Sequence, residues 1–205
     1  PFCFREGEEI VGFDVEVAQE VAHILHRQAI LRDMPFETLI PDLSLGQIDL
    51  IAAGMTPTPE RAKRVAFTRP YLVGDPLVVL VLKKNEAWLK QDLQSVQGKK
   101  IVVNEGYTAD LYLSQDPSYD LVRLASPADA FLALKTERDD AFVTAQSTLH
   151  QFLQTQGHEQ FVYAPLSSTP EESCSLVVAK KNAALLHEVQ EALDMLEENG
   201  TMDRL

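Results

Sequence analysis

Short apolar runs alternate with amphipathic segments along most of this 205-residue chain. The run Leu77–Leu82 (LVVLVL) is strongly β-forming, whereas the stretch that begins at Asp14 repeats its apolar residues every three or four positions, as a helix does. Alternating strand and helix signals of this length are typical of βαβ units with a mostly parallel sheet. The sequence therefore predicts an α/β fold in which helices flank the sheets.

The expected elements follow one another closely, with no internal repeat and no low-complexity tract. Strands are expected at residues 29–31, 50–53, 77–82, 101–103, 121–124, 141–143 and 174–179. Helices are expected at residues 14–25, 36–45, 60–64, 86–94, 107–113, 126–136, 146–154 and 183–198. Residues 71–76 lose the periodicity and contain Gly74 and Pro76, so they suit a crossover into a new unit.

Composition bounds the functions that are open to this chain. Its hydrophobic fraction of 45% is that of an ordinary globular protein with a sizeable core. Its net charge of -13 repels nucleic acid and anionic membrane surfaces, because binding to phosphates needs a basic face. No apolar run approaches the roughly 20 residues that cross a bilayer. We expect a soluble protein that binds no nucleic acid and that attracts cationic ligands.

Residue types that carry chemistry are sparse. The two cysteines, Cys3 and Cys174, are too few for a disulfide framework; free thiols are the commoner outcome, and a long-range bridge stays open. His23 and His26 lie one helical turn apart without a carboxylate at matching spacing, so no metal site is expected. No GxSxG or HExxH pattern is present. We therefore expect no catalytic residue, no metal and no cofactor.

Residues 48–71 combine a strand end with a helix start. The apolar residues 50–53 end at Gly54, and Thr58 followed by Pro59 reads as an N-cap and a first helical position. Ligands bind at the carboxyl ends of strands in open α/β sheets, and the free N–H groups of a helix start favour anions. Arg61 can grip a carboxylate through two parallel hydrogen bonds. The alternative is that Arg61, like its neighbours Lys63 and Arg64, belongs to a solvated helix face.

An ordered set of short motifs resembles the bacterial extracellular solute-binding proteins of the polar amino-acid type, which are periplasmic binding proteins that feed ABC importers. These motifs are Gly12-Phe13-Asp14, Phe36 before Leu39-Ile40-Pro41, the segment from Gly54 to Arg61 with Phe67-Thr68 and Pro70-Tyr71, Gly98-Lys99-Lys100, Gly106-Tyr107-Thr108, Asp140-Ala141, and Glu198-Asn199-Gly200-Thr201. No single tetrapeptide is decisive, but the set covers nearly the whole chain in family order.

The resemblance implies the two-lobed periplasmic binding protein-like II fold. Lobe 1 would comprise residues 1–75 and 174–205, and lobe 2 would be residues 76–173, inserted between them. The lobes would close on a ligand about hinges near residues 73–76 and 172–174. Family members usually begin with a strand and an aromatic-Pro-Pro-Phe turn. The resemblance thus implies that an opening strand precedes Pro1, and that a signal peptide precedes the mature chain in the precursor.

The resemblance also implies a ligand site. Its residues would be Asp14, Phe36, Ala53, Gly54, Thr56, Arg61, Asn104, Thr108, Thr144 and Gln146. Arg61 and the Thr108 N–H would bind the ligand carboxylate, and the Phe36 ring would stack on the ligand side chain. Asp14 reads as an N-cap on its own, and in basic-amino-acid binders it lies near the cationic tail. Ala145 stands where the family places the aspartate that takes the α-ammonium, so neutral acceptors would have to substitute.

The implied function is capture of a small amino acid, arginine or another basic one first, for the membrane permease of an ABC importer. We expect a monomer in the periplasm or another extracytoplasmic space, with a lipid anchor in the precursor compatible with the resemblance. Two alternatives stay open. Some relatives are cyclohexadienyl dehydratases, enzymes that bind a carboxylated substrate in the same cleft, and a ligand-sensing domain of a receptor would share the fold.

Overall fold

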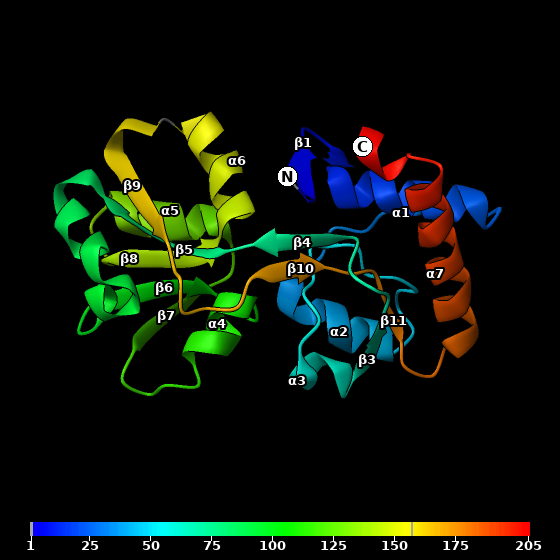
Figure 1. The fold of residues 1–205 in the computed structure, drawn as a ribbon, viewed down its shortest axis with the longest axis horizontal. Coiled ribbons are helices and arrows are strands. Elements are labelled where there is room, and N and C mark those ends of the chain that lie inside the picture. Colours follow the sequence, from blue (N-terminus) through cyan, green and yellow to red (C-terminus); the bar gives the residue numbers. More distant parts are fainter. Residues whose placement is uncertain (1, 157) are drawn as a thin grey trace. The chain divides into compact units, whose positions relative to one another are not determined.

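A computed structural model describes residues 2–156 and 158–205 of the chain, and Pro1 of the expected N-terminal turn lies outside the described residues. The chain divides into two compact units (Figure 1). Unit 1 comprises the residues up to Val73 together with Ser173–Leu205, and unit 2 comprises Gly74–Glu172. Each unit has its own core, so the two are taken separately below.

Unit 2 is built on a five-stranded sheet in the order β7-β6-β8-β5-β9. Its strands are β5 (Leu77–Leu82), β6 (Lys100–Asn104), β7 (Asp120–Leu124), β8 (Ala141–Ala145) and β9 (Phe161–Pro165). β6 pairs in parallel with β7 and with β8, whereas β5 pairs antiparallel with β8 and β9. Four strands therefore run in one direction and β5 alone runs against them.

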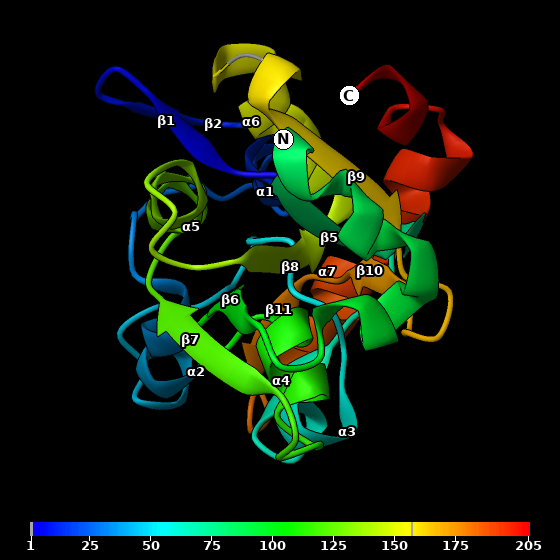
Figure 2. The same cartoon turned by 90° about the vertical axis from the view of Figure 1, so that its left-hand side faces the viewer.

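Helices cover both faces of this sheet (Figure 2). The 3₁₀ segment η1 (Lys83–Val96) and α4 (Thr108–Leu113) pack on one face, around residues such as Ile101. On the other face, α5 (Pro127–Lys135) and α6 (Gln146–Gln156) pack around Phe142. β8 is buried along its whole length, which explains why residues 141–145 are almost continuously apolar. A further 3₁₀ turn, η2, spans His158–Gln160.

Unit 1 has shorter strands and longer helices. Its helices are α1 (Phe13–Ile24), α2 (Phe36–Ser44), α3 (Pro59–Ala62) and α7 (Ala183–Glu198), with the 3₁₀ turn η3 (Met202–Arg204). Its strands form two antiparallel pairs, β1 (Phe4–Glu6) with β2 (Glu9–Val11) and β3 (Val65–Phe67) with β11 (Val177–Ala179). The C-terminal part of the chain thus completes a core that the N-terminal part begins.

Two clusters make up the core of unit 1. In the first, the apolar stripe of α1, with Val17 and Val21, packs against Val189 and Leu193 of α7. The second is formed by the inward face of α2 together with Ile51 and Val177. The stripes expected from spacing on all three helices are the faces that are buried.

The chain passes between the units at two paired strands. β4 (Leu72–Asp75) carries it out of unit 1, and β10 (Glu172–Cys174) carries it back. The two strands are hydrogen-bonded neighbours in a two-stranded sheet. The loss of periodicity at residues 71–76 therefore marks a short strand at the boundary between two units.

Several expected elements differ in the structure. The strand expected at residues 174–179 is divided into the end of β10 and β11, with residues 175 and 176 in neither. Residues 29–31 belong to no strand; Ile30 is 82% exposed, so this apolar run has no sheet to pack on. Residues 50–53 reduce to one antiparallel bridge, Ile51 with Val177, because the strand that returns there is only three residues long. The segment that includes residues 86–94 forms 3₁₀ turns instead of an α-helix.

Within residues 2–156 and 158–205, no helix has the length and apolar character that crossing a bilayer requires. The same residues contain no cluster of three or more His, Cys, Asp or Glu that could hold a metal ion. Cys3 and Cys174 are free thiols, and Cys174 is buried.

Candidate functional site

The helix start expected at residues 58–61 is present in unit 1. The Thr58 hydroxyl accepts a hydrogen bond from the Arg61 N–H at 3.2 Å, and Pro59 occupies the first turn of α3. The Arg61 guanidinium is not on a solvated helix face, because the residue is only 6% exposed. One of its Nη atoms donates to the Thr56 carbonyl oxygen at 2.7 Å. The structure therefore places a buried cation, oriented by the backbone, at the expected anion-binding position.

Phe36 opens α2 and lies beside this cation. The Arg61 guanidinium carbon is 5.5 Å from the centre of the Phe36 ring, within the range of a cation–π contact. Phe36 is half-buried, and Phe36 and Ala53 both pack against the same apolar cluster of unit 1. The sequence suggested stacking on a ligand; the structure shows that the ring also supports Arg61.

Thr56 ties the same segment to the returning chain. Its hydroxyl donates to the Ser173 carbonyl oxygen at 2.6 Å and accepts from the Ser173 N–H at 3.3 Å. No pattern in the sequence pointed to Ser173, because Thr56 and Ser173 are 117 positions apart. Segment 53–56 is thus held at the start of β10, where the chain re-enters unit 1.

Asp14 takes a different position from the one expected. It is not the N-cap of α1: that residue is Gly12, and the Asp14 N–H donates to the Phe2 carbonyl oxygen at 2.8 Å. Its carboxylate points inward, where Oδ2 accepts from the Gly54 N–H and Oδ1 accepts from the Tyr71 hydroxyl at 2.7 Å. Asp14 is 0% exposed. Helix start, glycine turn and Tyr71 therefore meet at one buried carboxylate.

Burial dominates the electrostatics of this group. It raises the pKa of the Asp14 carboxyl from 3.8 to about 6, although both hydrogen bonds act in the opposite direction. Burial and then the Asp14 charge raise the pKa of Tyr71 well above its usual value of 10. Cys3 as a whole residue is exposed, yet its thiol lies among enough protein atoms for desolvation, followed by Asp14, to raise its pKa to about 11.

The backbone conformation and the surroundings of Gly54 both require a glycine. Its φ of +61° lies in the left-handed region, and a Cβ there would come within 3.0 Å of the Phe2 ring. The hydrogen bond from the Gly54 N–H to Asp14 therefore requires a residue without a side chain at position 54. Gly54 was expected to contact the ligand; the structure adds that it links Asp14 to the segment that carries Thr56.

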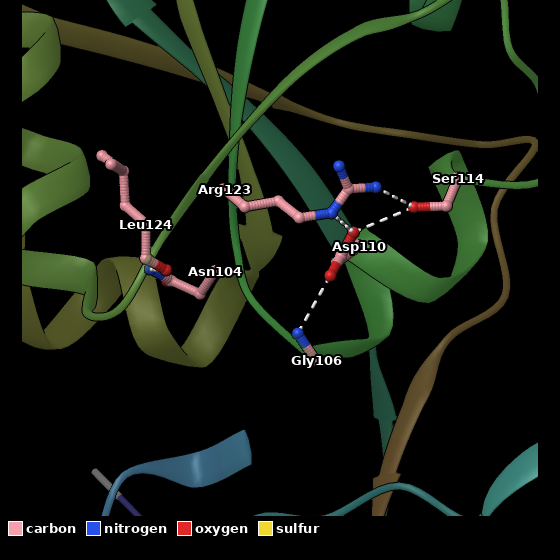
Figure 3. A network of polar contacts seen from close by, with 6 residues as sticks. All are labelled: Asn104, Gly106, Asp110, Ser114, Arg123 and Leu124. Atoms are coloured by element: carbon pink, nitrogen blue, oxygen red, sulfur yellow. Dashed lines mark hydrogen bonds and ion pairs between the residues drawn. The ribbon is translucent and has the colours of Figure 1, made fainter.

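Unit 2 contains the turn expected at residues 104–108. Asn104 ends β6, Thr108 begins α4, and both residues are buried. Figure 3 shows how the turn between them is held: the Asp110 carboxylate accepts from the Gly106 N–H at 2.9 Å. Gly106 has a φ of +77°, so this turn also uses the left-handed region. Asp110 was not among the expected site residues, although a carboxylate in a first helical turn is a recognisable signal.

An ion pair supports Asp110 (Figure 3). Nε of Arg123 on β7 lies 2.8 Å from one carboxylate oxygen, and the Ser114 hydroxyl donates to the same oxygen at 2.9 Å. A guanidinium nitrogen of Arg123 donates to Ser114 at 2.7 Å, which closes the network. The glycine turn of unit 2 therefore rests on a carboxylate with a cationic partner.

The remaining expected residues lie at the end of β8. Thr144 is 2% exposed, and its hydroxyl oxygen has no hydrogen-bond partner within the described chain; the same holds for the Asn104 side-chain oxygen. The Asn104 amide nitrogen donates to the Leu124 carbonyl oxygen at 3.2 Å. Gln146, half-buried, begins α6 next to Ala145. Unsatisfied buried oxygens are uncommon in folded proteins, so these two are candidate acceptors for a donor group.

Unit 1 brings together two sets of the expected residues. Asp14 contacts Gly54, and Arg61 contacts both Thr56 and Phe36. In unit 2, Asn104 and Thr108 flank one turn, while Thr144 and Gln146 adjoin Ala145. Sequence reasoning missed the side chains that hold these groups, which are Phe2, Tyr71, Asp110, Ser114, Arg123 and Ser173.

Comparison with known proteins connects this geometry to a family. The model of the bacterial extracellular solute-binding proteins, family 3, matches residues 1–205. The chain belongs to this family. The ABC transporter arginine-binding protein 1 of Escherichia coli (strain K12) is 30% identical to it over 97% of this chain and 81% of that protein. The relatives found are solute-binding proteins.

Solved structures support the same fold for this solute-binding protein. The P235GK mutant of ArgBP from T. maritima superposes with a TM-score of 0.90 at 34% identity, over 99% of this chain and 87% of that one. An ancestral arginine-binding protein bound to glutamine has a TM-score of 0.90 at 29% identity, over 100% of this chain and 90% of that one. The expected periplasmic binding protein fold is confirmed.

Proposed function

We propose that this chain is the substrate-binding component of an amino-acid ABC importer and that it binds arginine or another basic amino acid. The observation that carries the proposal is the placement of Arg61: a buried guanidinium, oriented by the Thr56 carbonyl oxygen and lying over the Phe36 ring. Such a group can take a carboxylate in two parallel hydrogen bonds. The arginine-binding relatives support the ligand class.

The other expected residues would complete the site. The Thr108 N–H, at the start of α4, would add a donor for the same carboxylate. The Phe36 ring would stack on the ligand side chain. With Ala145 in place of an acid, the half-buried Gln146 would meet the α-ammonium first, and Thr144 and Asn104 offer acceptor oxygens beside it.

The proposal includes the setting of the molecule. The chain would act as a monomer outside the cytoplasmic membrane, deliver its ligand to a membrane permease and perform no chemistry. The family's extracellular character and the transporter names of its relatives support this. Closure about the paired strands β4 and β10 would accompany binding, and a fall in the radius of gyration on saturation with ligand would measure it.

Thermal shifts against the twenty amino acids test the ligand. An amino acid at about 100 times its dissociation constant should add about 2.7 kcal/mol to the free energy of unfolding. We expect L-arginine to stabilise most and L-lysine next. Stabilisation by L-glutamine or L-glutamate without L-arginine would overturn the basic ligand. If no amino acid stabilised the protein, formation of an aromatic product from arogenate or prephenate would favour a dehydratase.

A further inference from the structure

The buried carboxylate of Asp14 is the starting point. The family resemblance implied that Asp14 lies near the cationic tail of a ligand. In the structure its two oxygens already accept from protein donors, the Gly54 N–H and the Tyr71 hydroxyl, and the residue is fully buried. A ligand cation could reach this fully buried carboxylate only if the protein atoms that cover it moved aside. Direct contact between Asp14 and the ligand is therefore disfavoured.

What Asp14 does hold is the segment that carries the candidate site. Gly54 lies two residues before Thr56, whose carbonyl oxygen orients the Arg61 guanidinium. The Gly54 N–H ends at Asp14, while the Thr56 hydroxyl is fixed by Ser173. Segment 53–56 is thus attached at two points, by Gly54 to a carboxylate and by Thr56 to the backbone of the returning strand.

We propose that Asp14 is a positioning residue: its carboxylate holds the Gly54 amide and so fixes the Thr56 carbonyl that orients Arg61, without touching the ligand. The inference rests on the proposed function for its effect on binding, but its structural part stands apart from any ligand. An ionised acceptor makes hydrogen bonds roughly twice as strong as a neutral one, so charge on Asp14 matters for this hold.

Proton uptake by Asp14 would weaken the hold. A protonated carboxyl has one O–H donor and keeps less acceptor capacity, and it faces two donors here. The Tyr71 hydroxyl can turn and accept, whereas the Gly54 N–H cannot. Other titratable groups act here as well. The charge of the chain's amino group lowers the pKa of Asp14, Cys3 responds to the charge of Asp14, and Cys174 acts on Tyr71 from β10. Because burial raises the pKa of Asp14 to about 6, the change falls in an accessible range.

The first experiment needs no ligand. In ¹⁵N-labelled protein, the Gly54 amide resonance is followed from about pH 4.5 to pH 8 in wild type, in Asp14→Asn and in Glu16→Gln. Glu16 is exposed in the same first turn of α1, so its variant makes the same change of charge as a control. We expect an inflection near pH 6 in wild type and Glu16→Gln, and none in Asp14→Asn. A Gly54 amide with no inflection in wild type would overturn the proposal.

The second experiment separates positioning from direct contact. Calorimetry with L-arginine and with L-glutamine compares the same three proteins at about pH 8 and pH 5. Positioning predicts that Asp14→Asn weakens both ligands alike, by about tenfold at pH 8, and that the gap to wild type closes at pH 5. Loss of L-arginine binding alone would mean direct contact with the cation and overturn the proposal, as would unchanged binding of both. If wild type bound neither ligand, the proposed function would fail, and the amide titration would still decide the role of Asp14.

Discussion

Both units hold a glycine turn with a buried carboxylate, but the partners of the two carboxylates differ. Each has a glycine turn in the left-handed region, and in each a buried carboxylate from the first turn of a helix accepts the glycine N–H. In unit 2, Asp110 is four residues from Gly106 and has Arg123 as a cationic partner. In unit 1, Asp14 is 40 residues from Gly54, and its second partner is the neutral Tyr71 hydroxyl.

This difference shows what a charge partner does for a buried carboxylate. An ion pair with good hydrogen bonds offsets the loss of hydration, whereas neutral donors offset less of it. The turn of unit 2 is therefore held by a stabilising network. The turn of unit 1 is held by a group whose ionised form is costly to bury, as the raised pKa of Asp14 shows. At neutral pH Asp14 is mostly ionised, so the Gly54 N–H has a charged acceptor. We expect the burial of that charge to lower the stability of unit 1.

The largest expected effect separates the two units in ligand binding. Arg61→Ala in unit 1 should weaken L-arginine binding by about 2–5 kcal/mol, the range for truncating one partner of a buried charge pair. Thr108→Ala in unit 2 should cost only about 0.5–1.5 kcal/mol, because the main-chain N–H of the helix start remains. Calorimetry measures both, with exposed Arg64→Ala as the control for net charge. Equal losses in the two variants would remove the distinction between the units.

The second prediction concerns pH and unit 1. For Asp14, a pKa of 3.8 in the unfolded chain and about 6 in the folded one is worth about 3 kcal/mol. The folded state holds the proton on Asp14 more tightly than the unfolded chain does. The stabilisation that this proton adds to the folded state is fully present below about pH 4 and is lost as pH rises through about 6. Asp14→Asn should therefore raise the free energy of unfolding at pH 7 by up to about 3 kcal/mol and change it little at pH 4.

Denaturant unfolding from pH 4 to pH 8 measures this slope in wild type, Asp14→Asn and the control Glu16→Gln. The control should keep the wild-type slope between pH 4 and pH 6. A variant Asp14→Asn that is less stable than wild type at pH 7, with an unchanged slope, would show that the unit 1 carboxylate is well compensated after all.

The third prediction is that the equivalent substitution in unit 2 destabilises the protein instead of stabilising it. Asp110→Asn should lower the free energy of unfolding by about 1–3 kcal/mol, because the amide would present a donor to a site that faces three donors and would leave Arg123 without its carboxylate. The same denaturant unfolding at pH 7 measures it. Asp129→Asn on α5, which also removes a carboxylate from a first helical turn but is exposed, is the matched control. If Asp110→Asn instead stabilised the protein, the ionised form of Asp110 would be costly to bury, as that of Asp14 is, and the contrast between the two units would fail.

The smallest expected effects compare one hydroxyl in each network. Tyr71→Phe removes the buried donor to Asp14 and should cost about 1 kcal/mol, whereas Ser114→Ala removes an exposed donor to Asp110 and should cost about 0.5 kcal/mol or less. Thermal unfolding resolves both. Tyr71→Phe should also move the inflection of the Gly54 amide to higher pH, because one hydrogen bond that favours the ionised carboxylate is lost.

Local patterns predicted much of this molecule. Thr58, Pro59 and Arg61 lie within four residues, so capping rules located the helix start correctly, whereas spacing alone left open whether Arg61 lies on a solvated helix face. The apolar stripes of α2 and α7 and the strand β5 were likewise recognisable from spacing. Each of these features is decided by neighbours in the sequence.

The features that local patterns did not predict depend on partners that are distant in the sequence. Asp14 was expected to cap its helix, but the carbonyl of Phe2 meets its N–H, and its carboxylate finds Tyr71 57 residues away. The apolar run at residues 29–31 was expected to be a strand, yet a strand needs a neighbour, and the described chain pairs none with it. Neither outcome could be read from spacing, because each depends on a part of the chain that is distant in sequence.

The interrupted path of unit 1 also has a consequence for synthesis. Ile51, β3 and α1 pair or pack with Val177, β11 and α7, so the core of unit 1 joins residues more than 100 positions apart. Unit 2 is continuous, and its sheet needs nothing beyond Glu172. As the chain emerges during synthesis or export, unit 2 can fold while the apolar faces of α1 and α2 stay uncovered until Ser173–Leu205 follow. The residues of unit 1 that precede unit 2 in the sequence are thus among the last to be packed, and they include Arg61.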